Sequence, residues 1–175
     1  MNGRYRNLDL AIRKLGASKT HLRLVEVGTY DGERAKSMLT LWNAFEGARS
    51  AEYIGFDLFE RMDPVTNTVE LSKSRLPPAI HVVIKKLSAL NNVSVSLIKG
   101  NTRDTLAGAV QLMRPADLIF IDGGHSLITI ASDWQGLQPI IDKNTIVLFD
   151  DYYLNRDDVG CKTLTTSLQQ DPPIS

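Results

Sequence analysis

Residues 117–125 read DLIFIDGGH, a run of strand-forming apolar residues that ends in a carboxylate, two glycines and a histidine. Residues 146–153 read IVLFDDYY and repeat the pattern with two carboxylates. Nearly continuous apolar runs are typical of parallel strands that are covered by helices on both faces. Ligands bind beyond the carboxyl ends of such strands. The side chains predicted at this working edge are Asp122, His125, Asp150 and Asp151.

Strand and helix patterns alternate along the rest of the chain. Further strands are predicted at residues 22–27, 52–57 and 93–99. Helices are predicted at residues 8–15, from the first turn to about 45, and at 79–90, 102–113, 126–137 and 159–169. Residues 59–78 contain Pro64, Pro77 and Pro78 and are interpreted as a long loop or insertion. Alternation of this kind predicts an α/β fold with a doubly wound, mainly parallel, Rossmann-like sheet and helices on both faces.

Length and composition limit the class of protein. A chain of 175 residues with 43% hydrophobic residues predicts one globular domain over residues 1–175. Its 20 basic and 20 acidic residues cancel, which argues against nucleic acid as a partner. No apolar run approaches the roughly 20 residues that span a membrane, and the N-terminal residues lack the apolar core of a signal peptide. The single cysteine, Cys161, excludes an internal disulfide. We therefore expect a cytoplasmic protein without a membrane partner.

The first predicted turn has the layout of a nucleotide-binding unit. Residues 25–32 read VEVGTYDG, a strand, a glycine turn and the start of a helix. The dinucleotide fingerprint GxGxxG is not met, because Tyr30 stands two residues after Gly28, and a dehydrogenase is therefore disfavoured. Asp57 closes the second strand, where a carboxylate accepts hydrogen bonds from ribose hydroxyls. Glu26 could contribute to the same site, or it could have only a structural role, as a strand-end carboxylate that accepts hydrogen bonds from loop amides. Together these features favour a nucleoside-type cofactor.

Four motifs in this order carry a family resemblance: EVGTYDG, GFD, DLIFIDGGH and IVLFDDY. The chain resembles class I S-adenosylmethionine-dependent methyltransferases over residues 22–153, and is similar to the group that includes macrocin O-methyltransferase-like enzymes. The resemblance implies the strand order 3-2-1-4-5 and S-adenosylmethionine as cofactor. It places the methionine part near the glycine turn, the ribose near Asp57 and the adenine near Asn101 and Thr102. The full set of implied cofactor-binding residues is Glu26, Gly28, Thr29, Tyr30, Gly32, Asp57, Asn101, Thr102 and Asp122.

The carboxylate edge predicts a metal site. Three neighbouring carboxylates repel one another unless a cation neutralises them, and their hard oxygen ligands suit Mg²⁺ or Ca²⁺, of which Mg²⁺ is the expected ion. The resemblance implies that Asp122, Asp150 and Asp151 hold this divalent ion. Histidine is the side chain most often used as a general base, so His125 is the candidate base, with Asp122 as the second catalytic residue. The structural alternatives are that Asp150 or Asp151 caps a turn and that His125 only leads into a helix capped by Ser126.

The expected function is S-adenosylmethionine-dependent O-methylation of a small-molecule hydroxyl, assisted by a divalent metal. Two alternatives stay open: a metal-dependent enzyme related to cephalosporin-hydroxylase-like proteins on the same scaffold, and a non-catalytic S-adenosylmethionine-binding module. The family's usual C-terminal β-hairpin is expected to be shortened or absent, as in a truncated chain, because only 24 residues follow Asp151. The fifth strand would then be an exposed edge, which a second copy in a homo-oligomer could cover.

Overall fold

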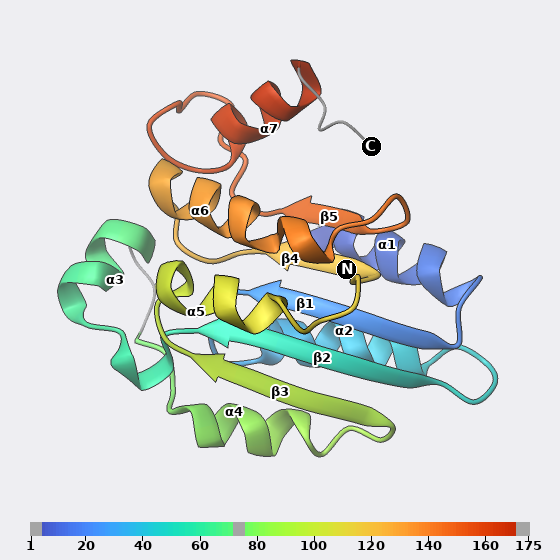
Figure 1. Ribbon diagram of the computed structural model, residues 1–175. Coiled ribbons are helices and arrows are strands. Elements are labelled where there is room, and N and C mark those ends of the chain that lie inside the picture. Colours follow the sequence, from blue (N-terminus) through green and yellow to red (C-terminus); the bar gives the residue numbers. More distant parts are fainter. Residues whose placement is uncertain (1–4, 72–75, 171–175) are drawn as a thin grey trace.

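A five-stranded parallel sheet forms the centre of the computed structural model, which describes residues 5–71 and 76–170 (Figure 1). The strand order is β3-β2-β1-β4-β5, and all four neighbouring pairs are parallel. This confirms the predicted fold class and strand order. The strands are β1 (His21–Val27), β2 (Ser50–Asp57), β3 (Val93–Lys99), β4 (Leu118–Ile121) and β5 (Ile146–Phe149).

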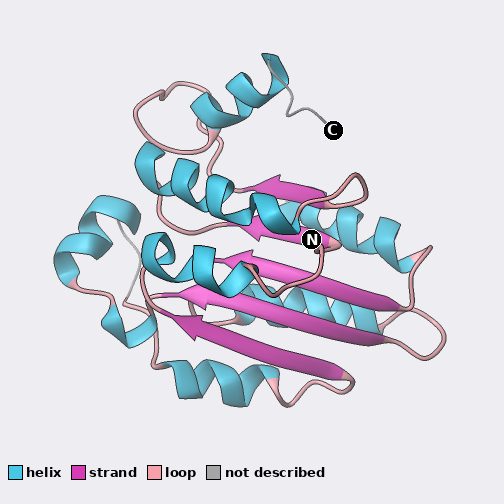
Figure 2. Cartoon of the chain, in the orientation of Figure 1, coloured by secondary structure: helices cyan, strands magenta, loops and turns pink. Residues whose placement is uncertain are grey.

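Helices cover both faces of the sheet (Figure 2). On one face, Leu24 of β1 packs in a core with α1 (Arg6–Gly16), α2 (Glu33–Asn43) and α4 (Ile80–Leu87). On the other face, Val25 and Val27 pack with α5 (Thr102–Val110) and α6 (Leu127–Leu137). Because alternate residues of a strand point to opposite faces, burial on both faces explains the continuous apolar runs. The remaining elements are α3 (Pro64–Leu71), α7 (Lys162–Gln170) and the short 3₁₀ turns η2 (Phe59–Arg61) and η3 (Gln138–Ile140).

The interpretation of residues 59–78 as a loop is wrong in part, because this stretch contains η2 and α3. Asp63 caps the start of α3, since its Oδ1 accepts hydrogen bonds from the backbone N–H groups of Val65 and Thr66 at 2.9 and 3.0 Å. Pro64 occupies the first helical position, where the missing N–H costs nothing. The proline that indicated a loop therefore starts a helix. Figure 1 shows α3 beside the carboxyl ends of the central strands.

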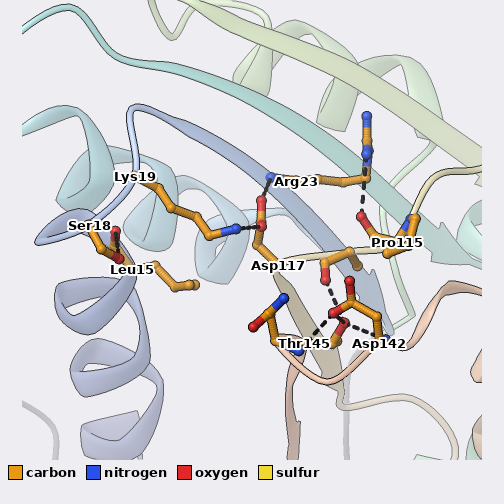
Figure 3. A network of polar contacts seen from close by, with 10 residues as sticks. Leu15, Ser18, Lys19, Arg23, Pro115, Asp117, Asp142 and Thr145 are labelled. Carbon is orange, nitrogen blue, oxygen red and sulfur yellow. Dashed lines mark hydrogen bonds and ion pairs between the residues drawn. The ribbon is translucent and has the colours of Figure 1, made fainter.

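Polar contacts fix the opposite, amino edge of the sheet (Figure 3). Asp117, which directly precedes β4, accepts hydrogen bonds from Lys19 Nζ at 2.5 Å and from the Arg23 backbone N–H at 2.7 Å. Thr145, just before β5, donates to the backbone carbonyl that precedes Asp117. These contacts join β1, β4 and β5 at the end away from Asp122. The first aspartate of the DLIFID stretch therefore has a structural role, and only the second lies at the working edge.

Beyond β5, the described residues contain α7 and one isolated antiparallel bridge, between Val159 and Ser126, but no sixth or seventh strand. β5 forms one border of the sheet. Throughout residues 5–71 and 76–170, no helix combines the length and the apolar character that crossing a membrane requires.

Candidate active site

A cavity of about 400 Å³ lies at the carboxyl edge of the sheet, among the turns that follow β1 to β5. A volume of this size is typical of small-molecule and cofactor sites. The predicted site residues that line it are Gly28, Tyr30, Asp57, Asn101, Thr102, Asp122, His125 and Asp151. Four others, Glu26, Thr29, Gly32 and Asp150, are absent from its wall. One cavity thus brings together the predicted cofactor side and the acidic edge.

Asp57 joins the turns that follow β1 and β2. Its Oδ2 accepts a hydrogen bond from the Tyr30 N–H and its Oδ1 accepts one from the Phe59 N–H, each at 2.7 Å. Both partners have positive φ, +51° and +49°, a region that costs free energy for residues other than glycine. Burial raises the pKa of the Asp57 carboxyl above its ordinary value. A carboxylate has about four lone-pair sites, so acceptor capacity remains for a donor in the cavity. Asp57 therefore shapes the turns and also borders the ligand space.

Two residues of the first turn face away from the cavity. Gly32 has φ +75°, and a Cβ atom there would lie 2.8 Å from Cγ1 of Val83 on α4. This glycine therefore allows α4 to pack closely against the start of α2. Thr29 is 2% exposed, and its Oγ1 lies 3.0 Å from the hydroxyl of Tyr53 on β2. Both residues therefore contribute to the packing of the turn after β1 rather than to the cavity wall.

Glu26 is a fully buried carboxyl at the end of β1. Its Oε2 accepts a hydrogen bond from the Tyr53 hydroxyl, whereas its Oε1 is buried without a hydrogen-bond partner in the described part of the chain. Burial raises the pKa of Glu26 from 4.5 to about 8, and the nearby charge of Arg34 opposes that rise in part. A buried acceptor without a donor is costly. The free oxygen therefore marks a place where a ligand donor would be stabilising.

The pKa of Glu26 predicts how stability depends on pH. Between pH 4.5 and about 8 the unfolded chain releases this proton while the folded protein keeps it, so the free energy of unfolding falls as pH rises through this window. Thermal melts of the cofactor-free protein at pH 5, 6, 7 and 8 should show Tm falling, with a flatter profile for Glu26→Gln. Glu46→Gln, at an exposed position, is the control and should follow the wild type. An unchanged pH slope in Glu26→Gln would contradict the assignment.

Asp122, Asp150 and Asp151 form the acidic cluster that the sequence predicted. One carboxylate oxygen from each lies within 4.8 Å of the others. Parallel pairing of β4 with β5 creates this proximity, because Ile121 pairs with Phe149 and the two strands end side by side. The Asp150 N–H donates to the Ile121 carbonyl at 2.9 Å. Burial and the Asp150 carboxylate raise the pKa of Asp122 well above its ordinary value. Three oxygen donors at this spacing fit a hard divalent cation, which would relieve their repulsion.

His125 pairs with a member of this cluster. Its Nε2 lies 2.7 Å from Asp151 Oδ2, and the Tyr153 hydroxyl donates to Asp151 Oδ1 at 2.8 Å. In the neutral tautomer with a proton on Nε2, Nδ1 carries the lone pair that can accept a proton. Asp151 has φ +57°, so its backbone is strained. The arrangement orients the imidazole, and it gives Asp151 a role in positioning His125 alongside its predicted role as a metal ligand.

The sequence analysis missed the contribution of α3. Its residue Glu70 accepts hydrogen bonds from the Ser126 N–H and Oγ and from Thr129 Oγ1, each at 2.9 Å. Ser126 is the N-cap of α6, as the structural alternative predicted. Met62 and Thr66 extend this side of the cavity wall. The DPVT sequence, a helix-start pattern of Asp followed by Pro, was the available signal for α3.

Asp133 on α6 was also missed. It is 1% exposed, and neither of its carboxylate oxygens has a hydrogen-bond partner among the described residues. Burial raises its pKa to about 6. A Cβ atom on Gly123 would lie 3.5 Å from Asp133 Oδ2, so the carboxyl lies directly behind the glycine turn that lines the cavity. The signal was a carboxylate on the apolar stripe of a helix, in line with Ile130 and Leu137.

Comparison with known proteins gives independent evidence on the family and the fold of the chain. A family model described as "Methyltransferase domain" matches residues 25–152. No curated protein sequence matches the chain. Among solved structures, the O-methyltransferase NovP is similar with a TM-score of 0.66 and 16% identity, over 95% of this chain and 69% of NovP.

Two further structures were solved with ligands. The methyltransferase MycE of the mycinamycin biosynthetic pathway, in complex with Mg and SAH, has a TM-score of 0.58 and 16% identity, over 94% of this chain and 42% of MycE. SAH-bound PaMTH1 from Podospora anserina has a TM-score of 0.56 and 20% identity, over 95% of this chain and 70% of PaMTH1. At these identities the likeness shows a shared fold, and the chain spans only part of each relative.

Proposed function

The chain belongs to the methyltransferase domain family, whose model matches residues 25–152, and from this premise we propose that it methylates a small-molecule hydroxyl. S-adenosylmethionine would be the methyl donor, and a divalent cation, Mg²⁺ by its preference for hard oxygen ligands, would assist. The observation that carries the proposal is the single cavity that has the Gly28 turn and Asp57 on one side and Asp122, His125 and Asp151 on the other. A donor and an acceptor placed there would meet in one cavity.

The residues present fit this cofactor. Asp57 borders the cavity with lone pairs available to ribose hydroxyls, and the turn after β3 adds Asn101 and Thr102 for the adenine end. Glu26, two residues before Gly28, does not line the cavity and would hold the turn that faces the methionine part. MycE and PaMTH1, which share the fold, were solved with SAH. These observations support an S-adenosylmethionine site at the carboxyl ends of β1 to β3.

The acidic side of the cavity fits acceptor activation. Asp122, Asp150 and Asp151 would hold the cation, which lowers the pKa of a bound hydroxyl when present. His125, oriented by Asp151, would take the hydroxyl proton at Nδ1. The protein would hold the acceptor oxygen facing the donor in the same cavity, of whose wall Thr66 and Glu70 of α3 are part. MycE, solved with Mg, supports the metal in a protein of this fold.

The cofactor site can be tested by calorimetry with S-adenosylhomocysteine. We expect the wild type to bind, and Asp57→Ala to bind roughly tenfold to hundredfold more weakly, because a charged acceptor for two hydroxyls is lost. Asp57→Asn keeps the shape of the side chain. Comparing it with Asp57→Ala separates the loss of the ribose contact from a collapse of the turns that Asp57 holds. Asp142→Ala is the matched control, since Asp142 also accepts a backbone N–H in a turn, from Asn144, but lies before β5 at the amino edge.

No binding by the folded wild type at millimolar ligand would overturn the proposed cofactor. Binding without methylation of any compound in a panel of hydroxylated metabolites would instead favour the alternative of a non-catalytic binding module.

A further inference from the structure

The helix α3 is attached to the rest of the protein mainly by polar contacts. From Pro64 to Glu70, none of its side chains is buried. Its two valines, Val65 and Val69, are 73% and 65% exposed. Because most helices in proteins are stabilised by the burial of an apolar face, hydrophobic packing contributes little to holding α3 in place. The position of α3 therefore depends on the hydrogen bonds that it makes.

One residue of α3, Glu70, holds the segment that carries the candidate base. Its backbone carbonyl accepts a hydrogen bond from the His125 N–H at 3.0 Å, and its Oε2 accepts one from the Ser126 N–H at 2.9 Å. Its Oε1 accepts from the hydroxyls of Ser126 and Thr129, each at 2.9 Å. A Cβ atom on Gly124 would lie 2.6 Å from Glu70 Oε2, so the absence of a side chain there lets the carboxylate approach the turn this closely. Two consecutive N–H groups, those of His125 and Ser126, are thus fixed by one residue of α3.

The same helix forms part of the cavity wall. Thr66 and Glu70 are four residues apart and therefore lie on one face of α3, and both line the cavity, as His125 does. The imidazole ring is oriented separately, by Asp151 at 2.7 Å. The backbone of the base thus depends on α3, whereas its ring depends on the loop after β5. A molecule that contacts Thr66 in the cavity would contact the helix that places the base.

We propose that Glu70 is a positioning residue for methyl transfer: by holding the His125–Ser126 segment to α3, it places the general base only while α3 is docked on the cavity wall. This inference rests on the proposed function and deepens it, because it adds a means of regulating the same site. An acceptor that contacts α3 in its docked position would stabilise that position and with it the placed base. Closure that completes the catalytic set is a common way to make a reaction wait for its substrate.

Glu70→Ala removes the three side-chain hydrogen bonds and keeps the backbone one. With the acceptor that the panel of hydroxylated metabolites identifies, it should lower the single-turnover rate roughly tenfold to hundredfold, the cost of a misplaced base, and leave S-adenosylhomocysteine affinity within about twofold. Glu70→Gln can still accept the Ser126 N–H and can donate to the hydroxyl oxygens, so it should restore the rate to within about threefold of the wild type. Exchange of the His125 and Ser126 amide protons, measured by NMR without any ligand, should accelerate in Glu70→Ala and much less in Glu70→Gln.

A double-mutant cycle with His125→Ala separates positioning from a general structural role. If Glu70 acts through His125, Glu70→Ala should cause no further fall in rate once the base is absent, so the two losses should not add. Glu60→Ala is the matched control, because Glu60 also accepts an N–H at the start of a helix, from Ile80 of α4 at 2.9 Å, but does not line the cavity. It should keep the wild-type rate per folded molecule.

An unchanged rate in Glu70→Ala, or losses that add in the cycle, would overturn the proposed role of Glu70 and leave the proposed function intact. Equal falls in rate and in S-adenosylhomocysteine affinity would show a collapse of the whole cavity and would overturn it too. If the wild type methylates no compound of the panel, the proposed function fails and this inference fails with it.

Discussion

Asp122→Asn is expected to lower the rate of methyl transfer by roughly 10²- to 10³-fold while S-adenosylhomocysteine affinity stays within about threefold. The reason is the position of Asp122, which lines the cavity and is also a member of the acidic cluster. An amide is a weaker ligand for a hard cation and leaves only two carboxylates in the cluster. Single-turnover rates with and without added Mg²⁺, together with calorimetry, give both quantities.

Although Asp122→Asn is expected to lower the rate, it is not expected to lower the stability of the metal-free protein. Burial and Asp150 raise the pKa of Asp122, so its charged form is costly in the folded protein unless a cation is bound. The amide carries no such cost. In the presence of a chelator, Asp122→Asn should therefore unfold at the same temperature as the wild type or above it. Added Mg²⁺ should raise Tm for the wild type and have little effect on the variant.

Asp117→Asn provides the control from the other end of β4. Asp117 pairs with Lys19 and the Arg23 N–H at the amino edge, so this variant should lose stability and keep its activity per folded molecule. If the wild-type rate survives chelation and Asp122→Asn is fully active, the metal-assisted mechanism is wrong. The family assignment would stand, because it rests on the match over residues 25–152.

The individual strands could be predicted from the sequence because their signals are local, whereas their order was implied by the family resemblance. Apolar runs gave the strands, and glycines and carboxylates at their ends gave the edge where ligands bind. The prediction that Asp122 would meet Asp150 needed only the strand order, since neighbouring parallel strands end side by side. The same order makes β1 and β2 neighbours, so Asp57 at the end of β2 lies beside the first turn and accepts a hydrogen bond from the Tyr30 N–H.

The missed features depend on contacts between side chains far apart in the sequence. Glu70 gains its role only when α3 meets Ser126, 56 residues away. The interaction of Asp151 with His125 depends on a loop in which Asp151 has positive φ, and no periodic pattern encodes that conformation.

Gly28→Ala is expected to destabilise the protein by about 4 kcal/mol or more, which places it among the most damaging substitutions. Gly28 has φ +91°, and a Cβ atom there would lie 2.0 Å from the Asp122 carbonyl oxygen and 2.8 Å from the Gly123 Cα. Both are backbone atoms of the turn after β4, held in place because the Asp122 N–H donates to Val27 at 2.8 Å. Chemical denaturation monitored by circular dichroism measures the loss.

Gly47→Ala separates backbone strain from steric contact. Gly47 has almost the same backbone angle, φ +89°, but a Cβ atom there would meet nothing within 4 Å. It should cost only the strain of placing alanine at positive φ, about 1–2 kcal/mol. The difference between the two losses in the free energy of unfolding measures the steric cost at Gly28. That cost arises where the turn after β1 touches the turn after β4, which carries Asp122. Equal losses would show that this contact is unimportant. A larger loss in Gly28→Ala would mean that the absence of one side chain sets how closely the proposed methyl-donor and acceptor sides of the cavity approach.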